Sequence, residues 1–258
     1  MKAPAGRERV APGVQRLLAA ARRAGSIAAD LAAGIEAFAL PQRCPSCGAP
    51  ARPSQLLCEG CLALLPPLAI PLCARCLARG REPAGCLAHP GHAVWAAWVY
   101  DERVALLVHA LKYQGRPGLA PALAVALERA LPAGSRAGGA ARHDFVTEVP
   151  LHEARRRERG YNQAAVLAES LADRLGVPRL PRVLERVRHT PPQARLGPAE
   201  RRANLAGAFR VRQPARLAGR RVLVVDDVLT TGATLEGCLD ALIGAGAEPA
   251  GVTLAWAQ

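Results

Sequence analysis

The chain has 258 residues, of which 50% are hydrophobic, so it is long enough for one large or two small domains with an apolar core. Its 34 Lys and Arg residues against 21 Asp and Glu residues give a formal net charge of +13, which favours a polyanionic partner: nucleic acid, pyrophosphate or an acidic membrane surface. Aromatic residues make up only 3% of the chain, which argues against an extended stacking platform for single-stranded bases.

Residues 1–40 predict a helical extension, with an alanine-rich amphipathic pattern from about Val14 to Phe38. Charged residues interrupt this pattern too often for a membrane-spanning helix or a secretory signal. The interrupting residues are Arg16, Arg22, Arg23, Asp30 and Glu36. Two interpretations stay open: a loosely held extension, or an element that docks on a partner or another domain. Because the sequence shows no signal peptide, we expect a cytoplasmic protein without a membrane span.

Residues 41–93 hold seven of the eight cysteines, in pairs whose spacing is typical of metal sites. The pairs are Cys44 with Cys47, Cys58 with Cys61, Cys73 with Cys76, and Cys86 with His89. Each pair can form a tight turn that directs two ligand atoms at one ion, so the four pairs supply enough ligands for two tetrahedral zinc sites. In the simplest arrangement the first two pairs bind one zinc ion and the last two bind another. A cross-braced arrangement also fits the spacing.

The eighth ligand is the least defined, because His92 lies close enough in sequence to replace His89. A disulfide framework is the competing interpretation, but nothing in the sequence directs the chain to an oxidising compartment. Both four-ligand sets are closed and leave no position for a catalytic water. We therefore expect a small double zinc ribbon, with one or two structural ions, and keep nucleic-acid binding as its rival role.

Residues 94–258 predict an α/β domain, because strand patterns alternate with helical ones. The predicted elements are a strand ending at Tyr100, helices over 104–113 and 119–131 around a turn at 115–118, a linker over 133–141, a strand over 144–149, a helix ending at Leu175 and a short strand near Val183. Such alternation favours a parallel sheet with helices on both sides.

Basic residues gather between Pro150 and Arg221, where 17 Arg against 6 acidic residues supply +11 of the net charge of +13. The densest run, Arg155 to Arg159, is either a solvated helix start or an anion-binding element. Because it follows a predicted strand end, at the edge where ligands bind in open α/β sheets, we favour anion binding.

The segment Val222–Thr234 carries the strongest chemical signal. Four apolar residues predict a strand covered on both faces, which stops at Asp226 and Asp227. The loop that follows contains Thr230, Thr231, Gly232, Ala233 and Thr234, and a helical pattern begins there. Backbone N–H groups, hydroxyls and a helix N-terminus suit a phosphate. The two acids require sugar hydroxyls or hydrated Mg²⁺, so a phosphorylated sugar satisfies both halves.

This segment resembles the type I phosphoribosyltransferase signature, which has four apolar residues, two acids, two apolar residues and a Thr/Ser-Thr-Gly-x-Thr/Ser loop. The resemblance implies the corresponding fold, with phosphoribosyl pyrophosphate and Mg²⁺ as ligands. It assigns the ribose hydroxyls to Asp226 and Asp227, which would be the catalytic pair, and the 5′-phosphate to Thr230–Thr234.

With the cysteine pairs and further motifs, the chain resembles the ComF proteins, which are associated with DNA uptake in natural competence. The further motifs are Leu111-Lys112-Tyr113-x-Gly115, Val149–His152, Arg159–Gln163, and Gln193 with Arg201 and Asn204. His89 stands where that family usually has a cysteine, and residues 1–40 have no counterpart in it.

The family resemblance implies that Arg155, Arg159 and Lys112 also contact the substrate. Two hypotheses of function stay open. One is a phosphoribosyltransferase of nucleotide salvage that acts on an unidentified acceptor. The other is a competence factor that binds phosphoribosyl pyrophosphate as a ligand and has single-stranded DNA and DNA-uptake proteins as partners.

Overall fold

The computed structural model describes residues 43–52, 56–68, 70–136, 139, 143–151, 153–187 and 207–258. The helical extension predicted over residues 1–40 lies outside these residues. Four of the residues in the motifs quoted above, His152, Gln193, Arg201 and Asn204, also lie outside them.

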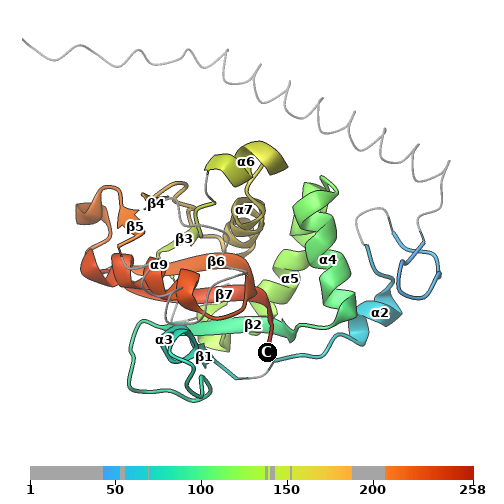
Figure 1. Cartoon of the computed structure of the whole chain (residues 1–258), viewed down its shortest axis with the longest axis horizontal. Coiled ribbons are helices and arrows are strands. Elements are labelled where there is room, and N and C mark those ends of the chain that lie inside the picture. The colour runs from blue at the N-terminus through green and yellow to red at the C-terminus, as the bar shows by residue number, and fades with distance from the viewer. Residues whose placement is uncertain are drawn as a thin grey trace, which may run out of the picture.

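A mixed sheet forms the centre of the described structure, with its five strands in the order β1-β2-β7-β6-β3 (Figure 1). The strands are β1 (Leu72–Cys73), β2 (Ala93–Val99), β7 (Glu248–Trp256), β6 (Arg221–Leu229) and β3 (Phe145–Glu148). Neighbouring strands run parallel, except that β1 is antiparallel to β2. The predicted α/β fold with a mostly parallel sheet is confirmed. The boundary predicted near residue 93 stays a prediction, and β1 extends the sheet from the cysteine-rich side of it.

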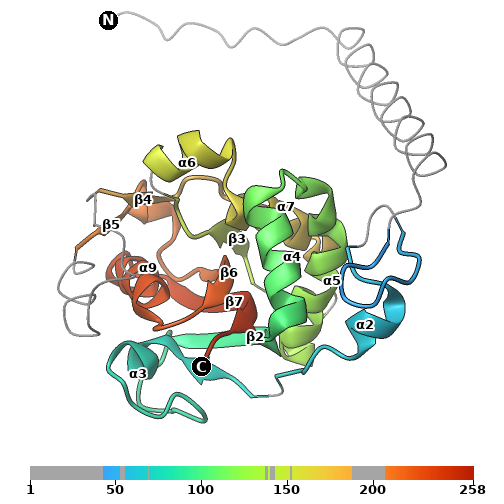
Figure 2. The same ribbon diagram turned by 45° about the vertical axis from the view of Figure 1, so that its right-hand side comes forward.

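Helices cover both faces of this sheet (Figures 1 and 2). One face carries α4 (Glu102–Tyr113), α5 (Ala120–Ala130) and α7 (Gln163–Leu175), and the other carries α9 (Ala233–Gly244) and the short α3 (Ala74–Ala78). Two separate apolar clusters result, one on each face. Strand β6 contributes to both, because neighbouring side chains on a strand point to opposite faces: Leu223 and Val225 join the first cluster, and Val222 and Val224 join the second.

The remaining elements are short. They are α2 (Glu59–Ala63), α6 (Glu153–Arg159), the two-stranded sheet of β4 (Leu184–Arg186) and β5 (Phe209–Val211), and 3₁₀ turns at Pro117–Leu119, Ala133–Ser135 and Pro214–Arg216. The run from Arg155 to Arg159 thus forms most of a helix of its own, α6. Gly160, with a φ of +78°, separates it from α7. Within the described ranges, no helix combines the length and the apolar character needed to cross a lipid bilayer.

Strand β6 differs from its prediction at its carboxyl end. We expected the strand to stop at Asp226 and Asp227, but it continues to Leu229. Its pairing with β3 ends at Glu148 opposite Val225, whereas its pairing with β7 continues to Leu229 opposite Trp256. The longer partner strand keeps the acidic pair in extended conformation, and the acids emerge just beyond the end of β3.

Candidate functional site

The loop after β6 forms the centre of the site. Residues Thr230 and Thr231 connect β6 to Gly232, the N-terminal cap of α9, and the helix begins at Ala233. Gly232 has a φ of +74°, a left-handed conformation that glycine adopts without steric cost. Thr230 is exposed and Thr231 is half-buried. The first N–H groups of α9 have no partner within the helix, so this loop can offer backbone donors and hydroxyls to an anion.

The acidic pair precedes this loop, and its two side chains lie on opposite faces of β6. Asp227 faces the side of α4 and is only 4% exposed. Its Oδ2 atom lies 3.0 Å from Nζ of Lys112, in the last turn of α4. Asp226 is half-buried, and its Oδ1 accepts a hydrogen bond of 2.9 Å from the backbone N–H of Asp227.

Burial and, to a lesser extent, the neighbouring charge of Asp227 raise the pKa of Asp226 to about 7. The hydrogen bond from the backbone of Asp227 and the charges of Lys112 and Arg159 oppose this rise. A second full negative charge at this position is therefore costly without a cation or additional hydrogen-bond donors. Mg²⁺ and the hydroxyls of a sugar are the two kinds of group that meet this need. The residues present thus fit the ligands that the sequence predicted for them.

Arg159 lies beside the same acids, and two residues hold its guanidinium. It donates to Oε1 of Gln163 over 3.1 Å and to the hydroxyl of Tyr113 over 3.2 Å, and it lies 5.0 Å above the ring of Tyr113. Its Nε atom is buried without a partner among the described residues. Gln163 and Tyr113 were not singled out as site residues, although both belong to motifs quoted from the sequence.

Arg155 is exposed on α6, and its charge acts on Arg186 of β4. Burial lowers the pKa of the Arg186 guanidinium, and the positive charge of Arg155 lowers it further. The charges of Lys112 and Arg159 therefore act on the acidic pair, whereas the charge of Arg155 acts on Arg186 of β4.

The motif Arg159–Gln163 also joins the elements around the site. The hydroxyl of Tyr161 donates to the carbonyl oxygen of Leu111 on α4. The side chain of Asn162 donates to the carbonyl of Val149 over 3.0 Å and caps α7 by accepting from the N–H of Ala164. These bonds join α4 and the end of β3 to the start of α7. They thereby help to fix the position of Lys112, in the last turn of α4, next to Asp227.

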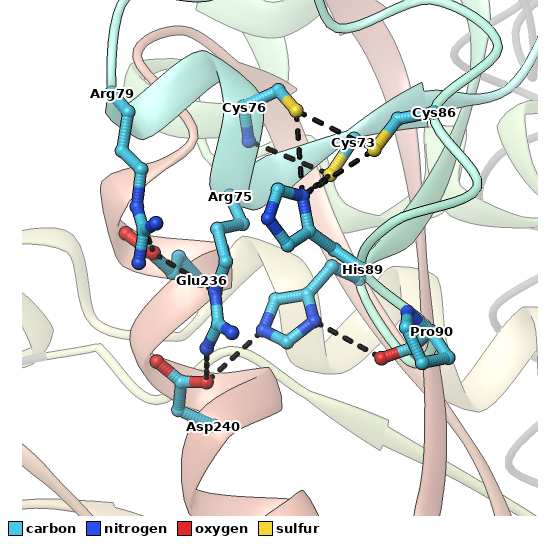
Figure 3. A network of polar contacts seen from close by, with 10 residues as sticks. Cys73, Arg75, Cys76, Arg79, Cys86, His89, Pro90, Glu236 and Asp240 are labelled. Atoms are coloured by element: carbon cyan, nitrogen blue, oxygen red, sulfur yellow. Dashed lines mark hydrogen bonds and ion pairs between the residues drawn. The ribbon is translucent and has the colours of Figure 1, made fainter.

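The cysteine pairs form two groups, each with its ligand atoms within 4.8 Å of one another. The first cluster is Cys44, Cys47, Cys58 and Cys61, and the second cluster is Cys73, Cys76, Cys86 and His89. Figure 3 shows the second cluster, in which Nδ1 of His89 lies 3.3–3.5 Å from the three sulfur atoms. The structure therefore shows the simplest of the predicted pairings, without cross-bracing, and its cysteines are free rather than joined in disulfides.

This geometry fits a tetrahedral metal ion. Zinc bound about 2.3 Å from each sulfur places two sulfurs about 3.8 Å apart, and the Sγ atoms of Cys76 and Cys86 are 3.5 Å apart. Burial and, to a lesser extent, the nearby Cys86 and Cys73 raise the pKa of Cys76 to about 12. The three thiols gathered in this way therefore need a cation to ionise together. The two cysteine clusters could hold zinc ions.

His92, the alternative eighth ligand, has a different role. It is buried, its Nε2 lies 3.0 Å from Oδ1 of Asp240 on α9, and its Nδ1 lies 3.2 Å from the carbonyl of Pro90. His89 is the histidine of the second cluster, where burial and the charges of Arg75 and Arg79 lower its pKa and favour the neutral imidazole that binds metals.

Comparison with known proteins agrees with this architecture. Residues 162–258 match the phosphoribosyl transferase domain family. The chain is 33% identical over 208 residues to the DNA utilization protein YhgH of Salmonella typhimurium, covering 79% of each chain, and 33% identical over 190 residues to competence protein F of Haemophilus influenzae, covering 70% of this chain and 81% of that one. A segment of 44 residues, 17% of this chain, is 57% identical to 23% of the adenine phosphoribosyltransferase of Salinispora tropica. With a phosphoribosyl transferase domain and two N-terminal cysteine clusters, the chain belongs to the ComF family of competence-related proteins.

Proposed function

We propose that this chain binds phosphoribosyl pyrophosphate together with Mg²⁺ at the carboxyl end of β6, in a process linked to DNA uptake. One observation carries the proposal: an acidic pair, with Asp227 buried and Asp226 half-buried, stands directly before a threonine loop at a helix N-terminus, and the charges of Lys112 and Arg159 act on it. A phosphate alone would be repelled by Asp226 and Asp227. A phosphorylated sugar instead places its phosphate on the threonine loop and its hydroxyl groups on the two acids.

Each group has a role in this complex. The N–H groups and hydroxyls of Thr230–Thr234 bind the 5′-phosphate, and Asp226 and Asp227 accept hydrogen bonds from the ribose hydroxyls. Lys112 and Arg159 supply positive charge to the pyrophosphate. Lys112 leaves Asp227 as the ligand enters, because one ammonium group cannot fully neutralise both anions. Mg²⁺, when bound, neutralises charge on the pyrophosphate oxygens.

The transferase hypothesis adds one chemical step. The bond between the anomeric carbon and the pyrophosphate oxygen breaks, its electron pair leaves with pyrophosphate, and a nitrogen lone pair of an acceptor forms the new bond. Positive charge develops on the ribose ring, which the two carboxylates stabilise. No acceptor-binding motif is evident in the sequence, so ligand binding without transfer is the form of the proposal that we test first.

The decisive measurement is calorimetric titration of phosphoribosyl pyrophosphate with and without Mg²⁺. We expect binding that requires Mg²⁺ and that weakens tenfold or more in Asp226→Asn/Asp227→Asn, because charge-assisted hydrogen bonds contribute about 1.5–3 kcal/mol each. Asp173→Asn, on the exposed side of α7, is the matched control and should bind as the wild type does. Unchanged affinity in the double variant would refute the site.

A second experiment distinguishes transfer from binding alone. It measures isotope exchange between pyrophosphate and phosphoribosyl pyrophosphate in the presence of a panel of bases.

Zinc in the two cysteine clusters completes the proposal. Structural zinc contributes directly to folding, so the purified protein should contain close to two zinc ions per chain. His89→Ala should lower this number to one, whereas His92→Ala should leave it at two, because His92 bonds to Asp240. A zinc content of one that His89→Ala does not alter would reject the second zinc site.

A further inference from the structure

The second cluster is packed directly against residues 230–234, the loop after β6 to which the proposed function assigns the 5′-phosphate. This loop is called the phosphate loop below. Helix α3 begins after Cys73 and contains Cys76, and its backbone meets the loop at Gly232. A Cβ atom on Gly232 would lie 2.6 Å from the carbonyl oxygen of Ala74 and 2.9 Å from Cβ of Leu77. Only glycine therefore fits between the cysteine segment and the start of α9. The left-handed φ of Gly232 is a second, independent reason for a glycine at this position.

Charged side chains join the same two helices (Figure 3). Arg75 of α3 forms an ion pair with Asp240 of α9 and lies 3.4 Å from Glu236, which Arg79 approaches at 3.9 Å. His92 lies 3.0 Å from Asp240 on the same side. The side chain of Glu236 is only 12% exposed, so water screens its interactions weakly.

Helix α3 has five residues, which is too few for a helix to be stable by itself. Its position depends on tertiary contacts. Cys73 is its N-terminal cap, the N–H of Ala74 donates to the carbonyl of His92 over 3.0 Å, and Cys76 directs its sulfur at the other ligands of the second cluster. A metal ion at this cluster thus holds both ends of the first turn of α3.

We propose that the second cluster is a positioning element for the phosphate loop. With its metal bound, α3 is a fixed surface on which Gly232 and the first turn of α9 take their ligand-binding arrangement. Ala74 and Arg75 are the positioning residues. Loading the second cluster with metal is therefore coupled to order in the loop and to affinity for the phosphorylated ligand. The effect on affinity rests on the proposed function, whereas the effect on the order of the loop does not.

The first cluster provides an internal contrast. Its residues Cys44 and Cys61 belong to the apolar cluster on the side of α4 and α5, whereas Ala74 and α9 share the apolar cluster on the other face. Loss of metal at the first cluster should therefore leave the phosphate loop unchanged. This predicts two structural metal sites with different effects on one ligand site.

Hydrogen exchange measured by mass spectrometry on the full chain tests the coupling without any ligand. We compare Cys86→Ser with Cys58→Ser, because both cysteines are half-buried and lie outside α3. Each variant should lose one metal ion. Only Cys86→Ser should speed exchange of the amides of residues 236–240, the first of α9 whose N–H groups bond within the helix. The expected change is about tenfold, which corresponds to about 1.4 kcal/mol of lost protection. A Cys86→Ser protein that lacks its ion and keeps wild-type exchange would overturn the proposal.

Two further variants keep the test decisive if Cys86→Ser does not fold. Gly232→Ala and Arg75→Ala leave all eight metal ligands in place, and both should weaken binding of phosphoribosyl pyrophosphate about tenfold at unchanged metal content. The matched controls are Gly60→Ala, where a Cβ atom meets nothing within 4 Å, and Arg81→Ala, an exposed arginine near the same cluster. Wild-type affinity in both test variants would overturn the coupling. If the wild type binds no phosphoribosyl pyrophosphate, the proposed function fails, and the exchange of residues 236–240 still shows whether the second cluster orders the start of α9.

Discussion

Nζ of Lys112 lies 3.0 Å from Oδ2 of Asp227, so the last turn of α4 supplies a counter-ion for the acidic pair. The side chain of Asp227 is 6% exposed and that of Lys112 is 21% exposed, which makes this a largely buried ion pair. The contact joins a lysine at the end of a helix to an acid on a strand that lies far along the chain.

Lys112→Met should destabilise the protein by about 3 kcal/mol, because it leaves the buried carboxylate of Asp227 without its charge partner. Urea unfolding at neutral pH measures this cost. Arg52→Met is the matched control, since Arg52 pairs with Glu59 over 3.1 Å while both side chains are more than 70% exposed, and it should cost less than about 1 kcal/mol. Equal costs for the two variants would show that the Lys112 pair does not stabilise the fold.

The pKa of Asp226, raised to about 7 mainly by burial, predicts an unusual dependence of stability on pH. Between its ordinary value of 3.8 and about 7, the folded protein keeps a proton that the unfolded chain has already lost. The free energy of unfolding should therefore fall as pH rises through this window, by less than about 1.4 kcal/mol per pH unit for one proton.

Asp226→Asn should remove this part of the pH dependence and gain stability relative to the wild type as pH rises from 4 toward 7. Urea unfolding at four pH values across that window measures the difference. Asp173→Asn, on the exposed face of α7, should keep the wild-type slope. If Asp226→Asn keeps it as well, the carboxyl group of Asp226 does not titrate as its surroundings imply.

The local features of this protein could be predicted from its sequence. The apolar run Val222–Val225 predicted a buried strand, and C-x-x-C spacing predicted two metal sites, because both signals depend on residues close together in the chain. Spacing could not choose between the simple and the cross-braced pairing. The choice depends on how the segment folds around β1, which pairs with β2 in the central sheet.

Long-range pairing could not be predicted in the same way. Strand β7 has weak strand signals, since it contains Pro249 and Gly251, yet it lies between β2 and β6. Gly251 suits that place because a Cβ atom there would lie 3.0 Å from Cγ2 of Val94 on β2. The continuation of β6 beyond the acids depends on this strand. The contact of Gly232 with Ala74 could not be predicted from the sequence either, because the two residues lie far apart in the chain. The sequence predicted only that Gly232 belongs to a phosphate-binding loop.

Asn162 allows a separate test of how the site is held together. Asn162→Ala removes both the cap of α7 and the bond to the carbonyl of Val149, and it should cost about 2 kcal/mol. Asn162→Ser keeps an acceptor that can cap the helix and loses the amide donor, so it should cost about half as much. Thermal or urea unfolding compares the two variants. If Asn162→Ser is as costly as Asn162→Ala, the cap does not contribute and the bond to the carbonyl of Val149 accounts for the whole effect.

The last prediction concerns single-stranded DNA, a partner under one of the two hypotheses that the sequence left open. One of the relatives is named a DNA utilization protein. Arg155, Arg156 and Arg157 are exposed on α6, and the charge of Arg155 acts on Arg186 of β4. If these arginines bind DNA phosphates, affinity should fall with salt with a log–log slope of about −0.7 per phosphate neutralised, and the triple alanine variant should flatten that slope by about 2. Fluorescence anisotropy over a salt series measures it.

The matched control removes the same charge elsewhere, through Arg43→Ala, Arg81→Ala and Arg129→Ala at three exposed positions outside α6. It should keep the wild-type slope, because a contact between specific arginines and phosphates depends on position and not on net charge alone. If α6 instead serves only the pyrophosphate, its triple variant loses affinity for phosphoribosyl pyrophosphate and keeps the wild-type salt slope for DNA. If the wild-type protein shows no salt-sensitive binding of single-stranded DNA at low ionic strength, DNA is ruled out as a direct ligand. Binding of phosphoribosyl pyrophosphate would then be the remaining proposal for this chain.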